Sequence, residues 1–466
     1  MSIQQLISIS RSSFRSLDAA MNATAQNVAN METEGYTRRR VTLQSDSLHV
    51  TGMYSPPAGR TATGAGVSVQ EYERLRDVLL QKSGWEARSG LGGFEEQHRV
   101  LGTIEGLLSG NGTSSLSRQL DAFYDSWALL ADQPNDSAVR LQLRSEAQGI
   151  ASTLNRLDGD LAHLSGEIHT DLAATVGEAN DLLKDIASLT ETISLARNQG
   201  APDLSAEDRR DQLIDTLSGL LPINVQADRR EGFTITTDGM TLVQGAKAVE
   251  LSTVDDGGVT KVGIGGEHYT LQQPTAAGGR IGAQLETINV IIPEARAELD
   301  VIAERLVEKT NEAHRSGYGI DGSTGIDFFD ATRTTAGSIR LSADVSAAGG
   351  HRLIAASTSD PGAGFYDSDV ARTIASHGKG FDGGAPSASA SFIDLTSSIG
   401  SRMKHASAEG TARAGVVDHL TALERGVSGV NLEEEMTSLI QFQQAYAASA
   451  RVLNTAQEMM DTLLRL

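Results

Sequence analysis

The residues best suited to chemistry lie between positions 311 and 327. The run Asp321-Gly322-Ser323-Thr324-Gly325-Ile326-Asp327 gathers carboxylate and hydroxyl oxygens, which are the ligands that Ca²⁺ prefers. Its spacing is not that of a calcium-binding hand, so a plain glycine turn is favoured over a cation site. His314 stands one helical turn after Asn311 and is expected to pack or hydrogen-bond at a helix end rather than act as a base or metal ligand.

Sequence motifs of the common enzyme classes are missing from the chain. It contains no H-E-x-x-H, no G-x-S-x-G and no G-x-x-x-x-G-K-[ST], and its ten histidines are scattered. There is no cysteine, so disulfides and thiolate chemistry are excluded. We therefore predict a protein that is not an enzyme and has no cofactor and no metal site.

Composition indicates a soluble chain of several domains. The 466 residues are 39% apolar, which is enough for real cores, and their number is typical of about three domains. A net charge of −21 argues against nucleic acid as a partner, because phosphate binding needs a basic face. Residues 1–14 hold no unbroken apolar run, so we expect neither a cleaved signal peptide nor membrane insertion.

Both ends of the chain carry apolar residues at heptad spacing. The first series is Ile3, Ile7, Ser10, Phe14, Leu17, Met21, Thr24 and Val28, and the second is Leu432, Met436, Leu439, Phe442, Tyr446, Ser449, Leu453, Ala456, Met460 and Leu463. Such narrow apolar stripes need partner helices. The two helices could pair with each other or with copies from neighbouring subunits.

Charge differs between the two ends. Residues 1–45 hold five arginines against three acidic residues, whereas residues 430–466 hold two arginines against five acidic residues. Opposite signs favour pairing of the two ends, although an exposed ion pair contributes only about 0 to 1 kcal/mol. The apolar stripes must therefore supply most of the energy.

The middle of the chain alternates helical and β-rich patterns. A helix of roughly 90 Å is expected over Ser137–Asn198, because its apolar residues keep a heptad spacing through Leu143, Ala147, Ile150, Leu154, Leu157, Leu161, Leu164 and Ile168 and on to Ala196. Other helices are expected over Val69–Leu108, Leu116–Ala131, Ile281–Leu306 with a kink or break at Pro293, and Phe392–Gly426. Short alternating runs between Leu221 and Gln273 predict strands.

These patterns predict a mainly α fold with an inserted β region. It would consist of terminal coiled-coil helices, a long helical-bundle rod domain and a small β-rich outer domain. The expected divisions are a terminal assembly domain (1–45 with 427–466), a helical rod domain (46–215 with 280–320 and 390–426), a β-rich inserted domain (216–279) and a glycine-rich mixed region packed on the rod or the β domain (321–389).

Three segments resemble one protein family. The run from Ala25 to Arg39, AQNVANMETEGYTRR, resembles the N-terminal signature of bacterial flagellar axial proteins, and the run from Val430 to Val452 resembles their C-terminal signature. The run VEKTNEAH from Val307 to His314, with Gly317, Gly322, Gly325 and Phe328-Phe329 after it, is similar to the hook-associated protein 1 family. Glu34 departs from the pattern, because many relatives have Pro before the Gly-Tyr pair.

The resemblance implies a structural subunit at the junction between hook and filament. It also implies export by the flagellar type III apparatus, location in the flagellum outside the cell, and polymerisation through the terminal helices. The implied partners are the hook protein, the second hook-filament junction protein, other copies in the axial tube and a cytoplasmic export chaperone. The alternative is another secreted coiled-coil axial or adhesive protein that converged on heptad ends.

Two sets of residues are expected to carry these contacts. The assembly interface is predicted to include Ile3, Ile7, Phe14, Leu17, Met21, Asn27, Asn30, Gly35, Tyr36, Arg38, Leu432, Met436, Leu439, Tyr446, Leu453 and Met460. The chaperone is predicted to bind Leu439, Ile440, Phe442, Tyr446, Leu453, Met460 and Leu463. On a simpler interpretation, Asn27, Asn30 and Gly35 only cap a helix and turn the chain, and Arg38–Arg40 form a solvated basic edge.

Overall fold

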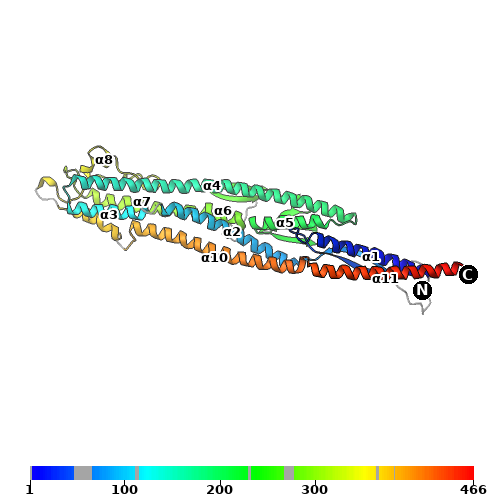
Figure 1. Ribbon diagram of the computed structural model, residues 1–466. Helices are drawn as coiled ribbons and strands as arrows, with labels where there is room; N and C mark the ends of the chain where they lie inside the picture. Colours follow the sequence, from blue (N-terminus) through cyan, green and yellow to red (C-terminus); the bar gives the residue numbers. More distant parts are fainter. Residues whose placement is uncertain are drawn as a thin grey trace.

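Helices dominate the fold and lie along one long axis. The computed structural model describes residues 3–46, 66–110, 115–228, 232–266, 278–363, 367–381 and 384–465. Helices α1 (Ile3–Ala29) and α11 (Leu432–Arg465) project together from one end and carry both chain termini (Figure 1). We call α1, α11 and the β1–β2 hairpin beside them the arm, and the rest of the described chain the rod.

The longest predicted helix is confirmed with its predicted bounds. Helix α4 (Ser137–Asn198) begins after Asp136, whose carboxylate accepts a hydrogen bond of 2.7 Å from the Ala138 amide. Its predicted apolar positions from Leu143 to Ile168 are at most 7% exposed. Helix α4 packs against α3 (Leu116–Asp132), α5 (Leu204–Leu220) and α7 (Ile292–Arg315).

The helix expected from Val69 begins nine residues later, so the prediction was wrong over its first part. Residues 66–74 form strand β2 (Gly66–Arg74), which pairs antiparallel with β1 (Arg39–Asp46). Helix α2 (Val78–Ser109) starts only after Asp77, whose side chain accepts hydrogen bonds from two amides of the first turn. Apolar and polar residues alternate around Val67 and Val69 with the period of a strand. The strand that pairs with this segment, β1, lies more than twenty positions earlier in the chain.

Helix α10 (Ala388–Ser428) lies antiparallel along α2 and contains the segment predicted as helix over Phe392–Gly426. Ser387 caps its amino end by accepting a hydrogen bond from the Ala390 amide. At its other end, Gly429 to Asn431 separate α10 from α11, which continues in nearly the same direction (Figure 1). These three residues form one of the two chain crossings between rod and arm.

The kink or break predicted at Pro293 takes the form of a π turn, through which the helix continues. Helix α6 (Gly279–Glu286) leads into a single π turn, η3 (Thr287–Ile291), and then directly into α7. The Ile292 amide donates to the Thr287 carbonyl, five residues back. The wider turn shifts the hydrogen-bond ladder just before the residue that has no N–H, so the predicted break is a π turn.

The predicted strands after Leu221 are confirmed. Strands β3 (Asn224–Asp228), β4 (Gly232–Thr237), β5 (Met240–Gln244) and β6 (Lys247–Ala248) form an antiparallel sheet in that order, and β7 (Leu251–Asp256) with β8 (Val259–Ile264) form a separate hairpin. Asn180 of α4 and Asn289 of the π turn each exchange two hydrogen bonds with this hairpin, at Leu251 and Thr260.

The glycine-rich region packs on the rod end opposite the arm. It contains the short helices α8 (Ala343–Ser346), η4 (Gly350–Leu353), η5 (Pro361–Ala363), α9 (Asp369–Ser376) and η6 (His377–Lys379). Phe328 and Phe329 are fully buried there against Phe123. Asn311 holds them in place, because its side-chain carbonyl oxygen accepts a hydrogen bond of 2.9 Å from the backbone amide of each.

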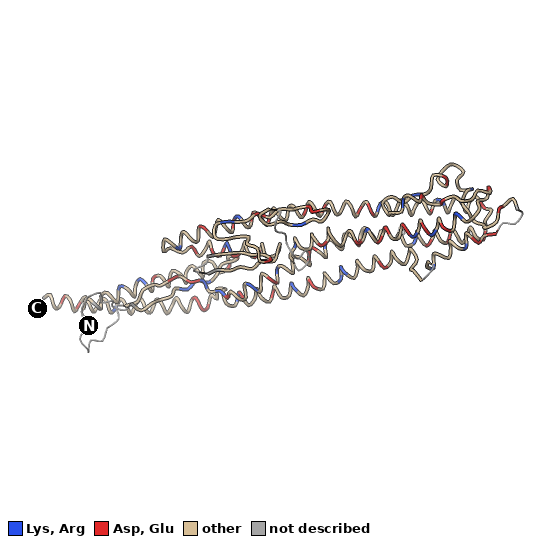
Figure 2. The backbone as a smooth tube through the Cα atoms, turned by 180° about the vertical axis from the view of Figure 1, so that it is seen from behind, with Lys and Arg blue, Asp and Glu red and all other residues tan. Residues whose placement is uncertain are grey.

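The arm does not share the hydrophobic core of the rod. The continuous core includes residues from α2 to α10 and from strands β3 to β8, and none of the described residues of α1, β1, β2 or α11 belongs to it. Acidic and basic residues are interspersed along both rod and arm (Figure 2). In the described helices, no segment combines the length and hydropathy needed to cross a membrane.

Candidate functional site

The residues singled out for chemistry hold the chain together instead. His314 is fully buried, with Nδ1 at 2.7 Å from the Ile326 carbonyl and Nε2 accepting the Ala355 amide at 2.9 Å. Burial lowers its pKa to about 4, so the ring is neutral and donates from Nδ1. Asp321 accepts both the amide and the hydroxyl of Ser323, as expected of a turn. Within the described ranges, no cluster of His, Asp and Glu is placed to bind a metal.

The two terminal helices pair with each other, antiparallel, along their predicted heptad stripes. The rings of Phe14 and Tyr446 lie 4.7 Å apart. The predicted positions Ile3, Ile7, Phe14, Leu17 and Met21 of α1 and Leu439, Phe442, Leu453 and Met460 of α11 are half-buried. The two helices therefore meet through the predicted stripes.

This pairing leaves much of the apolar surface of the arm uncovered. Among the described apolar residues of α1 and α11, only Ala20, Ala23 and Ala456 are fully buried. The large side chains of Leu432, Met436, Ile440, Tyr446 and Leu463 remain 41 to 63% exposed. A single chain thus covers only part of the surface that its two heptad stripes provide.

Asn27 organises the point where the arm meets the rod. Its side chain is 1% exposed, donates to the Arg39 carbonyl at 2.9 Å and accepts the Arg39 amide at 2.9 Å. The side-chain amide group of Asn27 also accepts a hydrogen bond of 2.9 Å from the Tyr36 hydroxyl and donates one of 3.1 Å to Glu435. One side chain therefore fixes the end of α1, the start of β1 and the start of α11.

Arg38 ties the same region to the end of the rod. Its Nε lies 2.6 Å from Glu435, which is 2% exposed, and its Nη1 lies 2.8 Å from Glu434. Its backbone amide donates to the Ser428 carbonyl at 2.8 Å, where α10 ends. We call the segment Asn30–Arg39, together with Leu75–Asp77 and Gly429–Asn431, the elbow.

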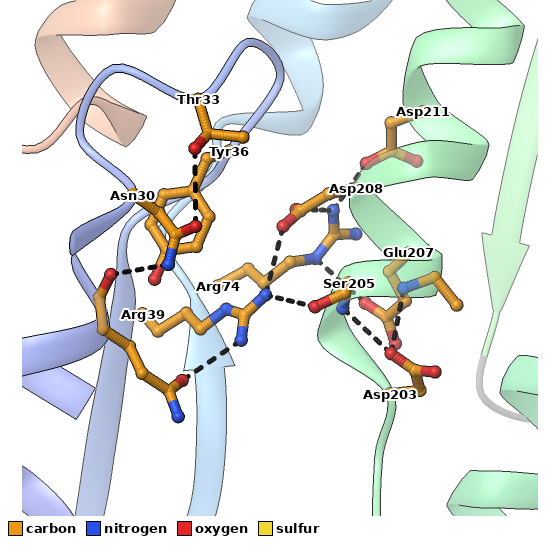
Figure 3. A network of polar contacts seen from close by, with 12 residues as sticks. Asn30, Thr33, Tyr36, Arg39, Arg74, Asp203, Ser205, Glu207, Asp208 and Asp211 are labelled. Carbon is orange, nitrogen blue, oxygen red and sulfur yellow. Dashed lines mark hydrogen bonds and ion pairs between the residues drawn. The ribbon is translucent and has the colours of Figure 1, made fainter. Parts of the chain in front are cut away.

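A second polar network joins the hairpin to α5 (Figure 3). Arg74 is 7% exposed and contacts Glu207 at 3.0 Å, Asp208 at 2.9 Å and Asp211 at 2.8 Å. Arg39 donates to Ser205 at 2.8 Å on the same helix. The arm is thus held on the rod by charged and polar contacts.

The charges of this network offset the cost of its burial. Burial alone would lower the pKa of Arg74, but Asp211, Glu207 and Asp208 raise it above its ordinary value. Burial lowers the pKa of the neighbouring Arg210 to about 10, although Asp211 and Glu207 act in the opposite direction. Both guanidinium groups stay charged near pH 7, and the cluster depends on its carboxylates being ionised.

Gly35 allows the tight turn of the elbow. Its φ angle is +74°, and a Cβ there would lie 1.9 Å from Nε2 of Gln212 on α5. That nitrogen donates to the Glu34 carbonyl at 2.8 Å, so the turn sits directly on the rod. Asn30 caps α1 by donating to the Gln26 carbonyl, as expected from the sequence.

The sequence did not identify the rod side of the elbow. Arg74, Glu207, Asp208 and Asp211 were not predicted to contact the arm, although the charged run Glu207–Asp211 was a visible signal. On the simpler interpretation Arg38 and Arg39 form a solvated basic edge, but they contact Glu435 and Asp208 within the same chain. Arg40 alone among the three keeps a mostly exposed side chain, at 61%.

Comparison with known proteins gives a consistent result. Residues 101–329 match the family model described as flagellar hook-associated protein FlgK helical domain, and residues 426–466 match flagellar basal body rod FlgEFG protein C-terminal. The chain is similar to flagellar hook-associated protein 1 of Bacillus subtilis (strain 168), with 26% identity over 96% of this chain and 95% of that protein. It is also similar to flagellar hook-associated protein 1 of Escherichia coli (strain K12), with 24% identity over the full length of both.

A solved structure has the same fold. The flagellar hook junction protein FlgK from Burkholderia pseudomallei aligns with a TM-score of 0.60 over 74% of this chain and all of that one, at 14% identity. The helical-domain match covers α3 to α7, and the second match covers α11 and the end of α10. On the family match and the end-to-end relatives, the chain is similar to the flagellar hook-associated protein 1 family over nearly its whole length.

Proposed function

We propose that this chain is a structural, non-enzymatic subunit of the bacterial flagellum at the junction between hook and filament, and that it assembles through its arm. Support comes from its similarity to that family and from the half-exposed apolar surface of α1 and α11. Helices with such surfaces gain most of their stability from packing against neighbours. The observation that carries the proposal is that the arm has no fully buried large apolar side chain among its described residues.

The proposed partners follow from the same surface. Copies of this chain would complete the apolar packing of the arm, and the hook protein and the second junction protein would bound the layer on its two sides. The matches over nearly the whole chain support this function over a converged adhesive coiled coil. Export through the flagellar type III apparatus, and hence a place outside the cell, is part of the proposal.

We also propose that a cytoplasmic export chaperone binds α11 before export. Of the seven predicted contact residues, Ile440, Tyr446 and Leu463 are exposed. The other four, Leu439, Phe442, Leu453 and Met460, are half-buried on the side where α11 meets α1. A chaperone that uses all seven must therefore displace α1, so α1 and the chaperone would compete for α11.

The proposed function can be tested on isolated hooks. Purified protein added to hooks that lack junction proteins should bind their ends and allow a filament to start, as seen by electron microscopy. Leu453→Asp should abolish this binding, because it places a charge in the arm interface. Leu141→Asp is the matched control, since Leu141 is 43% exposed on the rod, and should bind normally. Normal binding by Leu453→Asp would contradict assembly through the arm.

A further inference from the structure

The arm is joined to the rod through two short chain crossings at the elbow. Leu75–Asp77 connect β2 to α2, and Gly429–Asn431 connect α10 to α11. The backbone of Arg38 bridges the two crossings. Its carbonyl accepts a hydrogen bond of 2.9 Å from the Leu75 amide, and its amide donates one of 2.8 Å to the Ser428 carbonyl. Arg38 therefore lies on the line that connects both crossings.

A separate set of contacts holds the arm to one side of this line. On the arm side they come from Glu34, Arg39 and Arg74, and they reach α5, a helix that neither crossing enters. The Glu34 carbonyl accepts a hydrogen bond of 2.8 Å from Gln212, and the guanidinium of Arg74 has carboxylates of three α5 residues at 2.8 to 3.0 Å (Figure 3). We call these contacts with α5 the latch.

No continuous apolar core has to be broken to open the latch. The core of the rod contains no described residue of α1, β1, β2 or α11. The latch itself consists of charged and polar groups, which water can solvate once they separate. Because burial of charges carries a large desolvation cost, their rehydration offsets part of the Coulomb energy that is lost on opening. An open orientation of the arm is therefore closer in free energy than it would be across an apolar interface.

The polar contacts inside the arm do not depend on the latch. The side chain of Asn27 binds Tyr36 and Glu435, and the side chain of Arg38 binds Glu435 as well. These residues belong to the arm or to the elbow segment Asn30–Arg39 between α1 and β1. The pairing of α1 with α11 also lies within the arm. The arm can therefore move without losing its own structure.

We propose that the elbow is a latched hinge, in which the arm turns as one body about Arg38 when its contacts with α5 release. The two backbone hydrogen bonds of Arg38 form the pivot, and Arg74 is the main residue of the latch. Hinges usually consist of a few residues at the ends of helices and strands, as the two crossings do. This inference goes beyond the proposed function, because it concerns the free chain and not what the arm binds.

Distances between pairs of spin labels in the purified chain test the hinge, because the chain has no cysteine of its own. Labels on Ser194→Cys and Thr455→Cys report the distance between rod and arm. Labels on Asp18→Cys and Thr455→Cys report a distance within the arm, and all three positions are exposed. Double electron–electron resonance on the otherwise wild-type chain should give one main distance for each pair.

The double change Asp208→Asn and Asp211→Asn weakens the latch without altering any residue of the arm. A second population of rod–arm distances should appear, because loss of one charged hydrogen bond already shifts such an equilibrium roughly tenfold. The distance within the arm should stay the same. Asp160→Asn is the matched control, since Asp160 pairs with Arg156 on the surface of α4, and it should behave like wild type. Gln212→Ala is a milder variant that should broaden the rod–arm distance in the same direction.

Two results would overturn the hinge. A rod–arm distance that stays single in the double variant and in Gln212→Ala would mean that the contacts with α5 do not hold the arm. A broadened distance within the arm would mean that the arm comes apart instead of turning. Since these measurements need no hook, failure of the hinge can be told apart from failure of the proposed function.

Discussion

Asn27 and Glu435 lie 408 positions apart and share a buried hydrogen bond of 3.1 Å. Asn27 is in the last turn of α1, and Glu435 is in the first turn of α11. Because Arg38 bonds to the same carboxylate, one contact point joins both terminal helices to the segment between α1 and β1. The orientation of the arm therefore depends on a small number of polar side chains.

Replacing Asn27 by Ala should loosen the elbow specifically. The change removes the partner of the Arg39 amide and leaves buried polar groups unpaired, at a cost of about 1 to 3 kcal/mol. Hydrogen exchange at the Arg39 amide should accelerate by a factor of about 5 to 150, as that energy implies. Asn454→Ala, at an exposed position of α11, should leave this exchange unchanged. Unchanged exchange in Asn27→Ala would show that the amide is protected by other contacts.

The sequence predicted long helices best, because their pattern repeats many times. In α4 every predicted position from Leu143 to Ile168 is buried. The β1–β2 hairpin was missed because its two strands lie in segments assigned to other structure. The π turn could not be foreseen either, since Pro293 indicates only that the ladder must change there and not how.

The elbow was only half predictable from the sequence. Opposite charges at the two ends of the chain favoured pairing, and Arg38 does contact Glu434 and Glu435. The partners of Arg74 on α5 could not be derived, because more than a hundred residues separate them and the run Glu207–Asp211 reads equally well as a solvated helix face. Such pairings depend on how rod and arm meet, which no local pattern encodes.

Arg74→Met should destabilise the attachment of the hairpin to α5. It leaves Glu207, Asp208 and Asp211 facing one another in a buried site, and removing one partner from such a cluster costs about 3 to 5 kcal/mol. Calorimetry should show an earlier transition, and the additional change Asp208→Asn should restore part of the loss. Arg156→Met is the matched control, because Arg156 is half-exposed and pairs with Asp160 on the surface of α4. Loss of that ion pair should lower the free energy of unfolding by only about 0.5 kcal/mol.

Stability of the rod should fall with acidification through His314. Its pKa is about 4 in the folded chain, compared with 6.5 in the unfolded chain, so below pH 6.5 the unfolded state binds more protons. The unfolding free energy should therefore decrease between pH 6.5 and 4, by about 3 kcal/mol in total from this residue.

Denaturant unfolding at several pH values would measure this dependence. His314→Gln should be less stable at pH 7 and lack this part of the pH dependence, whereas His163→Gln should keep it, because the side chain of His163 is 77% exposed. An identical pH slope in His314→Gln and wild type would mean that His314 is not the group responsible.

Competition between α1 and the export chaperone leads to the last prediction. Deleting Thr455–Leu466 removes Met460 and Leu463 from the predicted chaperone site, so affinity for the cognate chaperone should fall in titration calorimetry. The rod should stay folded, because its core contains no described residue of α11. Deleting residues 1–29 should have the opposite effect on affinity, since it uncovers Leu453 and Met460 without removing any contact residue. If both deletions leave the affinity unchanged, the chaperone binds elsewhere, whereas weaker binding after removal of α1 would place α1 in the chaperone site instead of in competition with it.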